Sequence, residues 1–412
     1  MLKRFARYLE EGFGFLSSVQ ALRDGRCWAL IPTAAVWLSV LGGFVVRQRS
    51  LNALEQELKL PRRWETWVGR IKPSADTIAY TFQRFDCASL RALNWVMVKR
   101  LKRRKALQRR WVPGAMWVAA VDGHELFASR KRCCAECLVR QIQTREGVVT
   151  EYYHRVVVCQ LVGVTPPMVL DMELIRPGEG EVAAAHRLLQ RLLAACPRLV
   201  DVFTLDALYL EAPLVKWLRV RGKHVVIVLK EDRLHLTQDV EGLLPLTESV
   251  TIQEGSTTAT LWDIEDLTSW SALGDSVRVV CSEEEAVRRE RVGRQWIYRT
   301  ERHTWRWVTT LPASEVPASF IRIYGHLRWD LENRGFNEWV THWGFDHCFK
   351  HAPKAILAFL FTLVLAFALT MVFFTRALKP ALQAGKTRLW LALRFFEELA
   401  SCQGTYVWAR AP

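Results

Sequence analysis

The 412-residue sequence lacks both a disulfide framework and an evident secretory leader. Its ten cysteines are scattered along the chain, and the opening residues Met1-Leu-Lys-Arg-Phe-Ala-Arg do not resemble a signal peptide. Both absences favour a reducing cytoplasm over an oxidising compartment. The chain is long enough for two or three domains, and half of its residues are hydrophobic, so we expect a large core.

Acidic residues are scarce in the first quarter of the sequence. Residues 1–110 hold 22 Lys and Arg but only 8 Asp and Glu, a net charge of +14, whereas the whole chain carries +15. This concentration favours a region that binds a polyanion; a membrane-surface region or a merely soluble basic face is the alternative. The densest run, residues 99–110, would follow a phosphate backbone or form a solvated linker. The residues expected to contact DNA phosphates here are Lys99, Arg100, Lys102, Arg103, Arg104 and Lys105.

Helical patterns fill this basic region. Apolar residues at 51, 54 and 58 form an amphipathic stripe that Pro61 ends. Ser74 is suited to cap a second helix, and a third is expected from about Ala88 to Arg104. Short helices separated by basic turns resemble a helix-turn-helix module, although any small helical bundle shares this pattern.

Two apolar runs have the length of a membrane span. Cys27–Val46 and Ala355–Phe374 each contain about twenty residues without a charge. Pro32 and Gly42-Gly43 interrupt the first run, and the second follows a segment expected to carry a functional helix. We therefore predict that both are helices buried inside the protein. An integral membrane protein with a globular soluble part is the main structural alternative.

Asp122 follows a charge-free run, Ala115–Val121, which is bounded by Pro113-Gly114 and by Gly123. Such a run is typical of a central strand covered on both faces. Ligands of open α/β sheets bind beyond the carboxyl ends of the strands, so we expect Asp122 to lie where chemistry occurs.

Two later acids have comparable settings. Asp206 follows a second strand-like run, Leu199–Leu205, and Glu332 lies in a segment with helical periodicity that is expected to start near Pro317. With Asp122 they would bind divalent cations such as Mg²⁺, which prefer oxygen ligands. The alternative is that each acid is an isolated surface or capping residue. The apolar stripe that would place the helix on the sheet consists of Phe320, Tyr324, Leu327 and Leu331.

Three stretches of the chain resemble bacterial DDE transposases of the insertion-sequence type, in the group related to insertion sequence four. They are Val121–Glu125, Thr204–Leu210 and Ile323–Trp339, and with their spacing the resemblance covers roughly residues 50–375. It implies that Asp122, Asp206 and Glu332 are catalytic residues that bind two Mg²⁺ ions, with Mn²⁺ as a possible substitute. The family signature is Tyr, two residues, Arg, three residues, Glu, six residues, Lys. Arg328, expected to contact DNA phosphate, and Glu332 keep this spacing, but Gly325 and Trp339 occupy the Tyr and Lys positions.

The resemblance implies cut-and-paste DNA transposition. The partners would be double-stranded DNA, as terminal inverted repeats and as target, and a second copy of the chain in a synaptic homodimer. No small-molecule substrate is expected, and the protein would be cytoplasmic and associated with the nucleoid. A catalytically degenerate relative that only binds DNA is the alternative within this family.

The predicted fold class is α/β: a ribonuclease-H-like mixed-sheet catalytic core with a β-rich insertion and helical N- and C-terminal regions. The expected parts are residues 1–112, a basic helical DNA-binding region; 113–230, the first part of the core; 231–313, the β-rich insertion; 314–352, the catalytic helix that completes the core; and 353–412, an apolar helical C-terminal region.

Cys134, Cys137 and His154 offer three ligands for a zinc ion. Tetrahedral zinc needs four ligands, and Cys133 or His124 would have to complete the set. The alternative is a pair of reduced thiols on a hairpin. A further group with metal-like spacing, expected instead to be a histidine cluster near DNA, is His347, Cys348 and His351.

Three tryptophans, Trp296, Trp305 and Trp307, lie in the predicted β-rich insertion. An aromatic side chain there could stack on a base extruded from the duplex. Trp305 and Trp307 share one face of a strand, so hydrophobic packing is expected for at least one of them.

Overall fold

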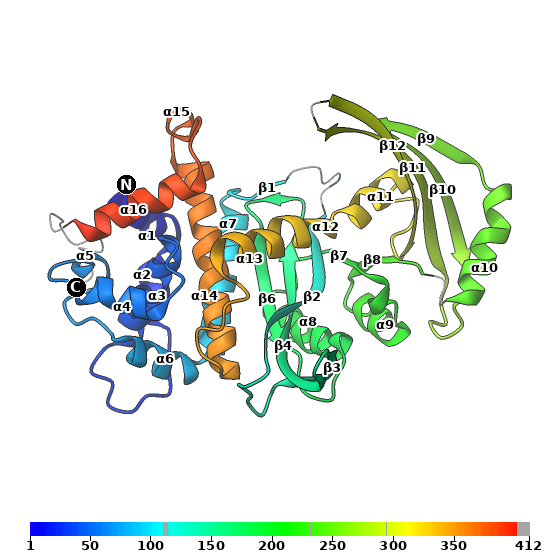
Figure 1. The fold of residues 1–412 in the computed structure, drawn as a ribbon. Helices are drawn as coiled ribbons and strands as arrows, with labels where there is room; N and C mark the ends of the chain where they lie inside the picture. The colour runs from blue at the N-terminus through cyan, green and yellow to red at the C-terminus, as the bar shows by residue number, and fades with distance from the viewer. Residues whose placement is uncertain (110–113, 115, 231–232, 294, 402–412) are drawn as a thin grey trace.

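A computed structural model describes residues 1–109, 114, 116–230, 233–293 and 295–401. A helical body, a central sheet and a curved antiparallel sheet follow one another across the molecule (Figure 1). The predicted boundaries at 112/113 and 230/231 involve residues outside this description, as do Arg110 of the basic run and Ala115 at the predicted strand start.

The central sheet has the mixed topology expected of the core. Strands β2 (Val118–Ser129), β7 (Val202–Leu205) and β8 (His224–Val228) are parallel neighbours. On the other side of β2, β4 (Gly147–Leu161) is antiparallel to it, and β6 (Met168–Leu174) is antiparallel to β4. Their largely apolar residues are buried, as in a sheet covered on both faces. The order β6-β4-β2-β7-β8, with helices between the later strands, confirms the α/β class and the ribonuclease-H-like core.

Helices make the connections that parallel strands require. Helix α8 (Glu181–Ala195) joins β6 to β7 and packs on β4 and β6. Helix α9 (Ala212–Arg219), with a proline in its first turn, joins β7 to β8. The remaining short strands are β3 (Leu138–Thr144), which forms a hairpin with β4, and the pair β1 (Gln108–Arg109) and β5 (Val164–Thr165).

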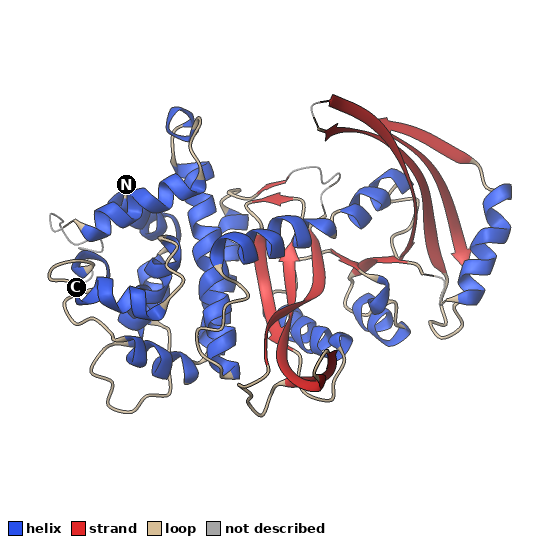
Figure 2. Ribbon diagram, in the orientation of Figure 1, coloured by secondary structure: helices blue, strands red, loops and turns tan. Residues whose placement is uncertain are grey.

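The predicted β-rich insertion is an antiparallel meander that follows helix α10 (Leu234–Leu243), which lies beside it (Figure 2). Its last strand pairs with β8 through Trp307–Thr309, so the meander extends the core sheet to ten strands. We call residues 249–309 the β-extension. Its strands are β9 (Ser249–Glu254), β10 (Thr257–Leu267), β11 (Val277–Val292) and β12 (Gln295–Thr309).

The helical body combines both terminal regions of the chain (Figure 1). Ser50 and Ser74 cap helices by accepting hydrogen bonds from the amides of Ala53 and Thr77, which confirms the predicted cap at Ser74. The helices are α1 (Leu2–Phe13), α2 (Phe15–Gln20), α3 (Thr33–Val45), α4 (Leu51–Lys59), α5 (Glu65–Val68), α6 (Ala75–Gln83), α7 (Cys87–Arg103), α14 (Pro353–Val372), α15 (Pro380–Gln383) and α16 (Arg388–Ala400).

The second apolar run is a buried helix. Pro353–Ala377 is, among the described residues, the one helical stretch long and apolar enough to cross a membrane, yet 94% of its most apolar window is buried within the protein. Helix α14 packs against α3, α6, α7 and β6. The indole of Trp37 on α3 donates a hydrogen bond of 2.9 Å to the Thr362 hydroxyl on α14, which joins the two apolar helices.

The first apolar run is helical only from Thr33 onward, so the prediction was wrong for residues 27–32. Pro32 has an extended backbone and directly precedes α3. A proline also disfavours helical geometry in the residue before it, which explains why the helix does not start earlier. Trp28 and Leu30 are 98% and 90% exposed rather than buried.

Candidate functional site

Asp122 and Asp206 follow two neighbouring parallel strands at one edge of the central sheet. The last parallel pair of β2 and β7 is Val121 with Leu205, and each acid is the following residue. One expectation was wrong, because β2 does not end at Asp122 but continues to Ser129, paired with β4. The carboxylate still lies where the parallel pairing stops, which is the edge at which such sheets bind ligands.

Glu332 reaches this edge from a segment of broken helices. Helix α11 (Ala318–His326), with Pro317 as its N-cap, is followed by α12 (Trp329–Leu331), a π-helical turn and α13 (Asn337–Trp343). The predicted continuous helix is therefore interrupted, and Glu332 is the first residue of the π-helical turn Glu332–Phe336. Such turns are common at functional sites. Tyr324, Leu327 and Leu331 of the predicted apolar stripe are buried.

Arg328 joins two of the three acids. Its Nη1 donates to Asp122 Oδ2 at 3.3 Å and to Glu332 Oε1 at 3.0 Å, and its side chain is only 10% exposed. Burial raises the pKa of Asp122 to about 6, although the Arg328 charge acts in the opposite direction. The arginine thus compensates two carboxylates that would otherwise repel each other.

A fourth carboxylate, Glu181, lies beside Asp122. Glu181 is buried at the start of α8, where it accepts hydrogen bonds of 2.8 Å from the Tyr209 hydroxyl and from Arg155. A Cβ at Gly123 would lie 2.1 Å from Glu181 Oε2, so the strand needs a glycine there. The charge of Glu181 also contributes to the raised pKa of Asp122. Sequence reasoning missed this residue, because an acid in the first turn of a helix is ordinary.

Asp206 lies apart from this network, next to an open groove. Its Oδ2 is 3.7 Å from the Lys230 ammonium, and the backbone at Asp206 begins a short 3₁₀ turn, Ala207–Tyr209. Lys230, Trp305 and Arg306 are among the residues that line the groove between β8, α10 and β12. The groove therefore combines cationic and aromatic side chains beside the third acid.

The donor set of the three acids suits a hard divalent cation, because every side-chain ligand atom is a carboxylate oxygen. Among the described residues, however, these three acids are not a set whose ligand atoms all lie within 4.8 Å of one another. Arg328 instead bridges two of them. Carboxylate oxygens are suitable ligands for Mg²⁺. In this structure the guanidinium of Arg328 is the cation that contacts two of the three acids.

The two positions that depart from the family signature are packing positions. A Cβ at residue 325 would lie 2.3 Å from the Trp307 indole nitrogen, so α11 can approach β12 only with a glycine there. Trp339 is fully buried and contacts the rings of Phe336, Phe345 and Phe367. Trp305 stacks on the buried Trp307, which confirms a packing role on this strand face, whereas Trp296 is exposed near the end of the β11–β12 hairpin.

The basic run divides into two groups. Lys99 and Lys102 donate to the carbonyls of Ala195 and Arg198, at the end of α8 and just beyond it, so they join α7 to the core. Arg100 also donates to a carbonyl, at Gly14. Arg103, Arg104 and Lys105 are exposed at and beyond the end of α7, where Arg104 donates to the Glu11 carbonyl at 3.3 Å. None of the three forms an ion pair with an acid of the described chain.

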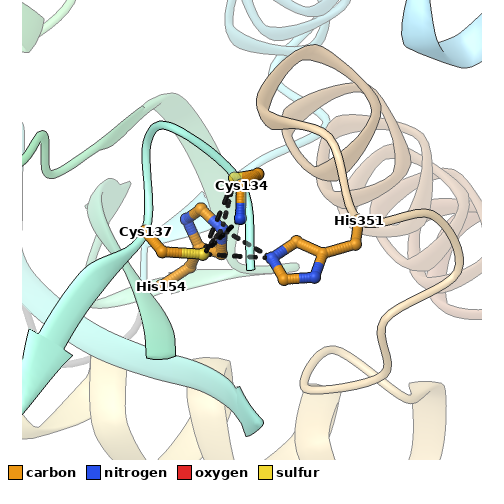
Figure 3. A group of neighbouring side chains, drawn as sticks. All are labelled: Cys134, Cys137, His154 and His351. Atoms are coloured by element: carbon orange, nitrogen blue, oxygen red, sulfur yellow. Dashed lines mark hydrogen bonds between the residues drawn. The ribbon is translucent and has the colours of Figure 1, made fainter. Parts of the chain in front are cut away.

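A second cluster contains Cys134, Cys137, His154 and His351, whose sulfur and nitrogen atoms point toward one another (Figure 3). The structure thus brings together the three predicted zinc ligands. The fourth member is His351, not Cys133, which is exposed, or His124, which stacks on Phe336 at 4.5 Å. His351 was predicted to belong to a separate histidine cluster, because no local spacing connects it to the two cysteines.

Burial explains the protonation of the cluster. It lowers the pKa of His154 to about 4 and raises the pKa of Cys137 to about 11, so the imidazole is neutral near pH 7. A neutral imidazole has a free nitrogen lone pair, which is the form that binds metals.

No curated protein matches the chain at a significant level. The family described as Transposase DDE domain matches residues 150–369, more than half of the chain. The matched segment contains Asp206 and Glu332 and begins after Asp122. It also spans the β-extension, the broken helices and most of α14. The chain therefore belongs to the transposase DDE-domain family, whose members act on DNA in transposition.

Proposed function

We propose that this transposase belongs to the group related to insertion sequence four and catalyses metal-dependent cleavage and strand transfer at insertion-sequence ends, by cut-and-paste transposition. The observation that carries the proposal is the meeting of Asp122 and Glu332 through Arg328, at the sheet edge where Asp206 follows the neighbouring strand. In the proposal, the acids from two strands and one helical segment together form one metal-binding site at this edge.

In this proposal Asp122, Asp206 and Glu332 hold two Mg²⁺ ions, or Mn²⁺ in their place. When bound, such ions activate a water or a 3′-hydroxyl and stabilise the leaving oxygen of the scissile phosphate. The three carboxylates must be ionised to act as ligands. Burial raises the pKa of Asp122 to about 6, so without a bound cation this carboxylate loses its charge as the pH falls through that value.

Arg328 has two roles in the proposed reaction. Without a cation it keeps Asp122 and Glu332 close together, because its Nη1 donates to both. The planar guanidinium also suits a phosphate, which can accept hydrogen bonds from two of its nitrogens. We therefore assign Arg328 to a DNA phosphate next to the cleaved bond once the carboxylates have their metal ions.

The groove beside Asp206 offers a path for the DNA backbone. Lys230 and Arg306 supply positive charge along it, and Trp305 supplies an aromatic ring. Arg103, Arg104 and Lys105 form an exposed basic group at the end of α7. The proposed partners are double-stranded DNA, as terminal inverted repeats and as target, and a second copy of the chain. The proposed place of action is the nucleoid in the cytoplasm, with no small-molecule substrate.

A salt titration tests the basic group. Replacing Arg103, Arg104 and Lys105 by Ala should weaken binding to any duplex and flatten the plot of log affinity against log salt by about 0.9 for each phosphate that is no longer neutralised. The control is Lys59→Ala, because the Lys59 ammonium is already paired with Glu55. An unchanged slope in the triple variant would show that the group does not bind phosphate.

A nicking assay tests the proposed function. The substrate is a supercoiled plasmid with the DNA that flanks the gene for this chain, incubated with the full-length protein and Mg²⁺, Mn²⁺ or EDTA. We expect nicking or excision at the flanking ends with either metal and none with EDTA. Binding of these ends without cleavage under either metal would instead identify a degenerate, DNA-binding relative, an alternative that the packing roles of Gly325 and Trp339 favour.

A further inference from the structure

Four potential metal ligands converge, three from neighbouring parts of the chain and the fourth, His351, from far along the sequence (Figure 3). Cys134 and Cys137 lie in the loop between β2 and β3, His154 lies on β4, and His351 lies between α13 and α14. Their ligand atoms all lie within 4.8 Å of one another. Because His154 and His351 are 197 positions apart in the sequence, tertiary folding rather than local geometry produces this cluster.

Five of the six separations between the four ligand atoms are close to those around one tetrahedral zinc ion. Zinc bonds of about 2.3 Å to sulfur and about 2.0–2.1 Å to nitrogen imply distances of about 3.8 Å between two sulfurs, about 3.6 Å between sulfur and nitrogen and about 3.3 Å between two nitrogens. The two sulfurs are 3.6 Å apart. His154 Nε2 lies 3.4 Å from each sulfur, and His351 Nε2 lies 3.2 Å from Cys137 Sγ and 3.2 Å from His154 Nε2.

Hydrogen bonding alone accounts poorly for this arrangement. Two neutral imidazole nitrogens that face each other at 3.2 Å require one to donate, and the same atoms also face thiols, which are weak donors and weak acceptors. His154 is fully buried, and its Nδ1 has no hydrogen-bond partner among the described residues, so Nε2 makes the polar contacts of this ring. Buried polar groups normally have strong partners. A cation at the centre of the four atoms would supply one.

We propose that Cys134, Cys137, His154 and His351 bind one zinc ion in a closed, four-ligand site. Zinc binding would release the thiol protons of Cys134 and Cys137 to solvent, and the resulting two thiolates with two imidazoles are a ligand set that zinc prefers over Mg²⁺. Because protein side chains would fill all four positions, the ion has no open position for a substrate. The role of the site is therefore structural.

The zinc ion would link the segment that leads into α14, in the helical body, to the central sheet. His351 lies two residues before α14, whereas the other three ligands belong to the β2–β3 loop and the β3–β4 hairpin. The ring of Phe127 on β2 contacts both His154 and His351, with centroids 5.7 and 5.6 Å apart. The ion would thus join the connection between α13 and α14 to the core sheet. The inference does not rest on the proposed function, because none of the three acids takes part.

The test is the zinc content of the full chain, purified without added metal. We expect about one zinc per chain from elemental analysis of the wild-type protein. Cys134→Ser and His351→Ala should each lower the zinc content of the purified protein, or increase the rate at which zinc is released to a chromogenic chelator by at least tenfold. Matched controls are Cys133→Ser and His347→Ala, which change the same residue types at neighbouring positions outside the cluster. Circular dichroism shows whether each variant folds.

Cobalt replacement tests the geometry without any variant. Wild-type protein reconstituted with Co²⁺ should show the intense ligand-field bands of tetrahedral cobalt together with sulfur-to-cobalt charge transfer. A metal-free protein with a Cys134–Cys137 disulfide would overturn the proposal. So would a pale octahedral cobalt spectrum, or zinc binding equally tight in the cluster variants and the controls.

Discussion

The carboxylate site consists of Asp122, Asp206 and Glu332, and the cysteine–histidine cluster consists of Cys134, Cys137, His154 and His351. Both use adjacent strands of one sheet, but their side chains are arranged differently. In the first, Asp122 on β2 and Glu332 are linked only through Arg328, and Asp206 pairs with Lys230 beside an open groove. In the second, the ligand atoms already converge, and His154 on β4 is fully buried. In the first site a protein cation separates two partly buried carboxylates, whereas in the second the ligand atoms face one another directly.

In the roles proposed above, the first site has to admit a substrate, whereas the second only has to hold its ligands. An open set of carboxylates leaves room for water and phosphate around a cation, at the cost of repulsion that Arg328 offsets. A closed set of sulfur and nitrogen atoms leaves no such room, and it stabilises the fold instead. Variants in the two sites should therefore fail in different ways.

The largest effect should come from the carboxylate site. Asp122→Asn, Asp206→Asn and Glu332→Gln should each reduce metal-dependent cleavage by more than about 10³-fold, because each removes a ligand charge, and a double variant should be little worse. Gel-shift affinity for DNA should stay nearly constant.

The control for these variants is Glu125→Gln on the same strand, since the Glu125 carboxylate is held by Arg140 at 2.8 Å. Full cleavage by Glu332→Gln would remove Glu332 from the site and direct attention to Asp330 or Glu338, on the same segment.

Substitutions in the cysteine–histidine cluster should change the thermal stability of the protein rather than its cleavage activity. His351→Ala should lower the midpoint of thermal unfolding by several degrees, corresponding to about 2–4 kcal/mol, because it removes a ligand of the proposed zinc ion between distant segments. His347→Ala should leave the midpoint nearly unchanged. Scanning calorimetry of both variants checks this; equal midpoints would mean that the cluster does not hold the two segments together.

Glu284 is a carboxylate that is fully partnered, in contrast to Asp122. It accepts hydrogen bonds from Arg322 at 2.9 Å and His326 at 2.7 Å, which join α11 to β11. Burial would raise the pKa of Glu284, but the bonds from His326 and Arg322 outweigh burial and lower it from 4.5 to about 2. A carboxyl group with a depressed pKa stabilises the fold above its ordinary pKa, and this contribution is lost as the pH falls from about 4.5 toward about 2.

Glu284→Gln should therefore cost about 1–3 kcal/mol of unfolding free energy at pH 7 and much less at pH 3. Urea unfolding of wild type and variant at both pH values measures the difference. A gap of the same size at pH 3 and pH 7 would contradict a role for the Glu284 charge.

The smallest effect should come from Glu181, which lies beside Asp122. Burial raises the pKa of Asp122 to about 6, and the Glu181 charge adds to this rise. Cleavage should therefore be lost as the pH falls through about 6, and Glu181→Gln should move this acid limb to lower pH by less than about one unit. Glu179→Gln, which removes a partner of Arg187 instead, is the control. Identical pH profiles would show that Glu181 acts only through packing.

The parts of the fold that could be predicted from the sequence are those whose pattern lies in consecutive residues. The uncharged strand before Asp122, the strand before Asp206 and the apolar helix at 355–374 are buried on all sides, so their sequences are almost continuously apolar. The prediction failed at residues 27–32, because an equally apolar composition does not overcome the restriction that Pro32 places on the preceding backbone.

The sites were predicted less completely, for a physical reason. Asp122 and Asp206 each follow a recognisable strand, whereas Glu181 and His351 are defined by partners elsewhere in the chain. Tyr209 lies 28 positions from Glu181, and Cys137 lies 214 positions from His351. Gly325 carried no signal either, because its requirement comes from Trp307 on another element. Local spacing cannot show such long-range proximity.

The packing of α3 against α14 has a consequence for synthesis. Helix α3 leaves the ribosome early, but its apolar partner at 353–372 follows more than three hundred residues later. At about 5–20 residues per second the delay is on the order of 15–60 s. During that interval the apolar surface of α3 lacks its final cover, so we expect the nascent chain to depend on chaperones. A product that ends before residue 353 would lack this cover altogether, so we expect it to aggregate.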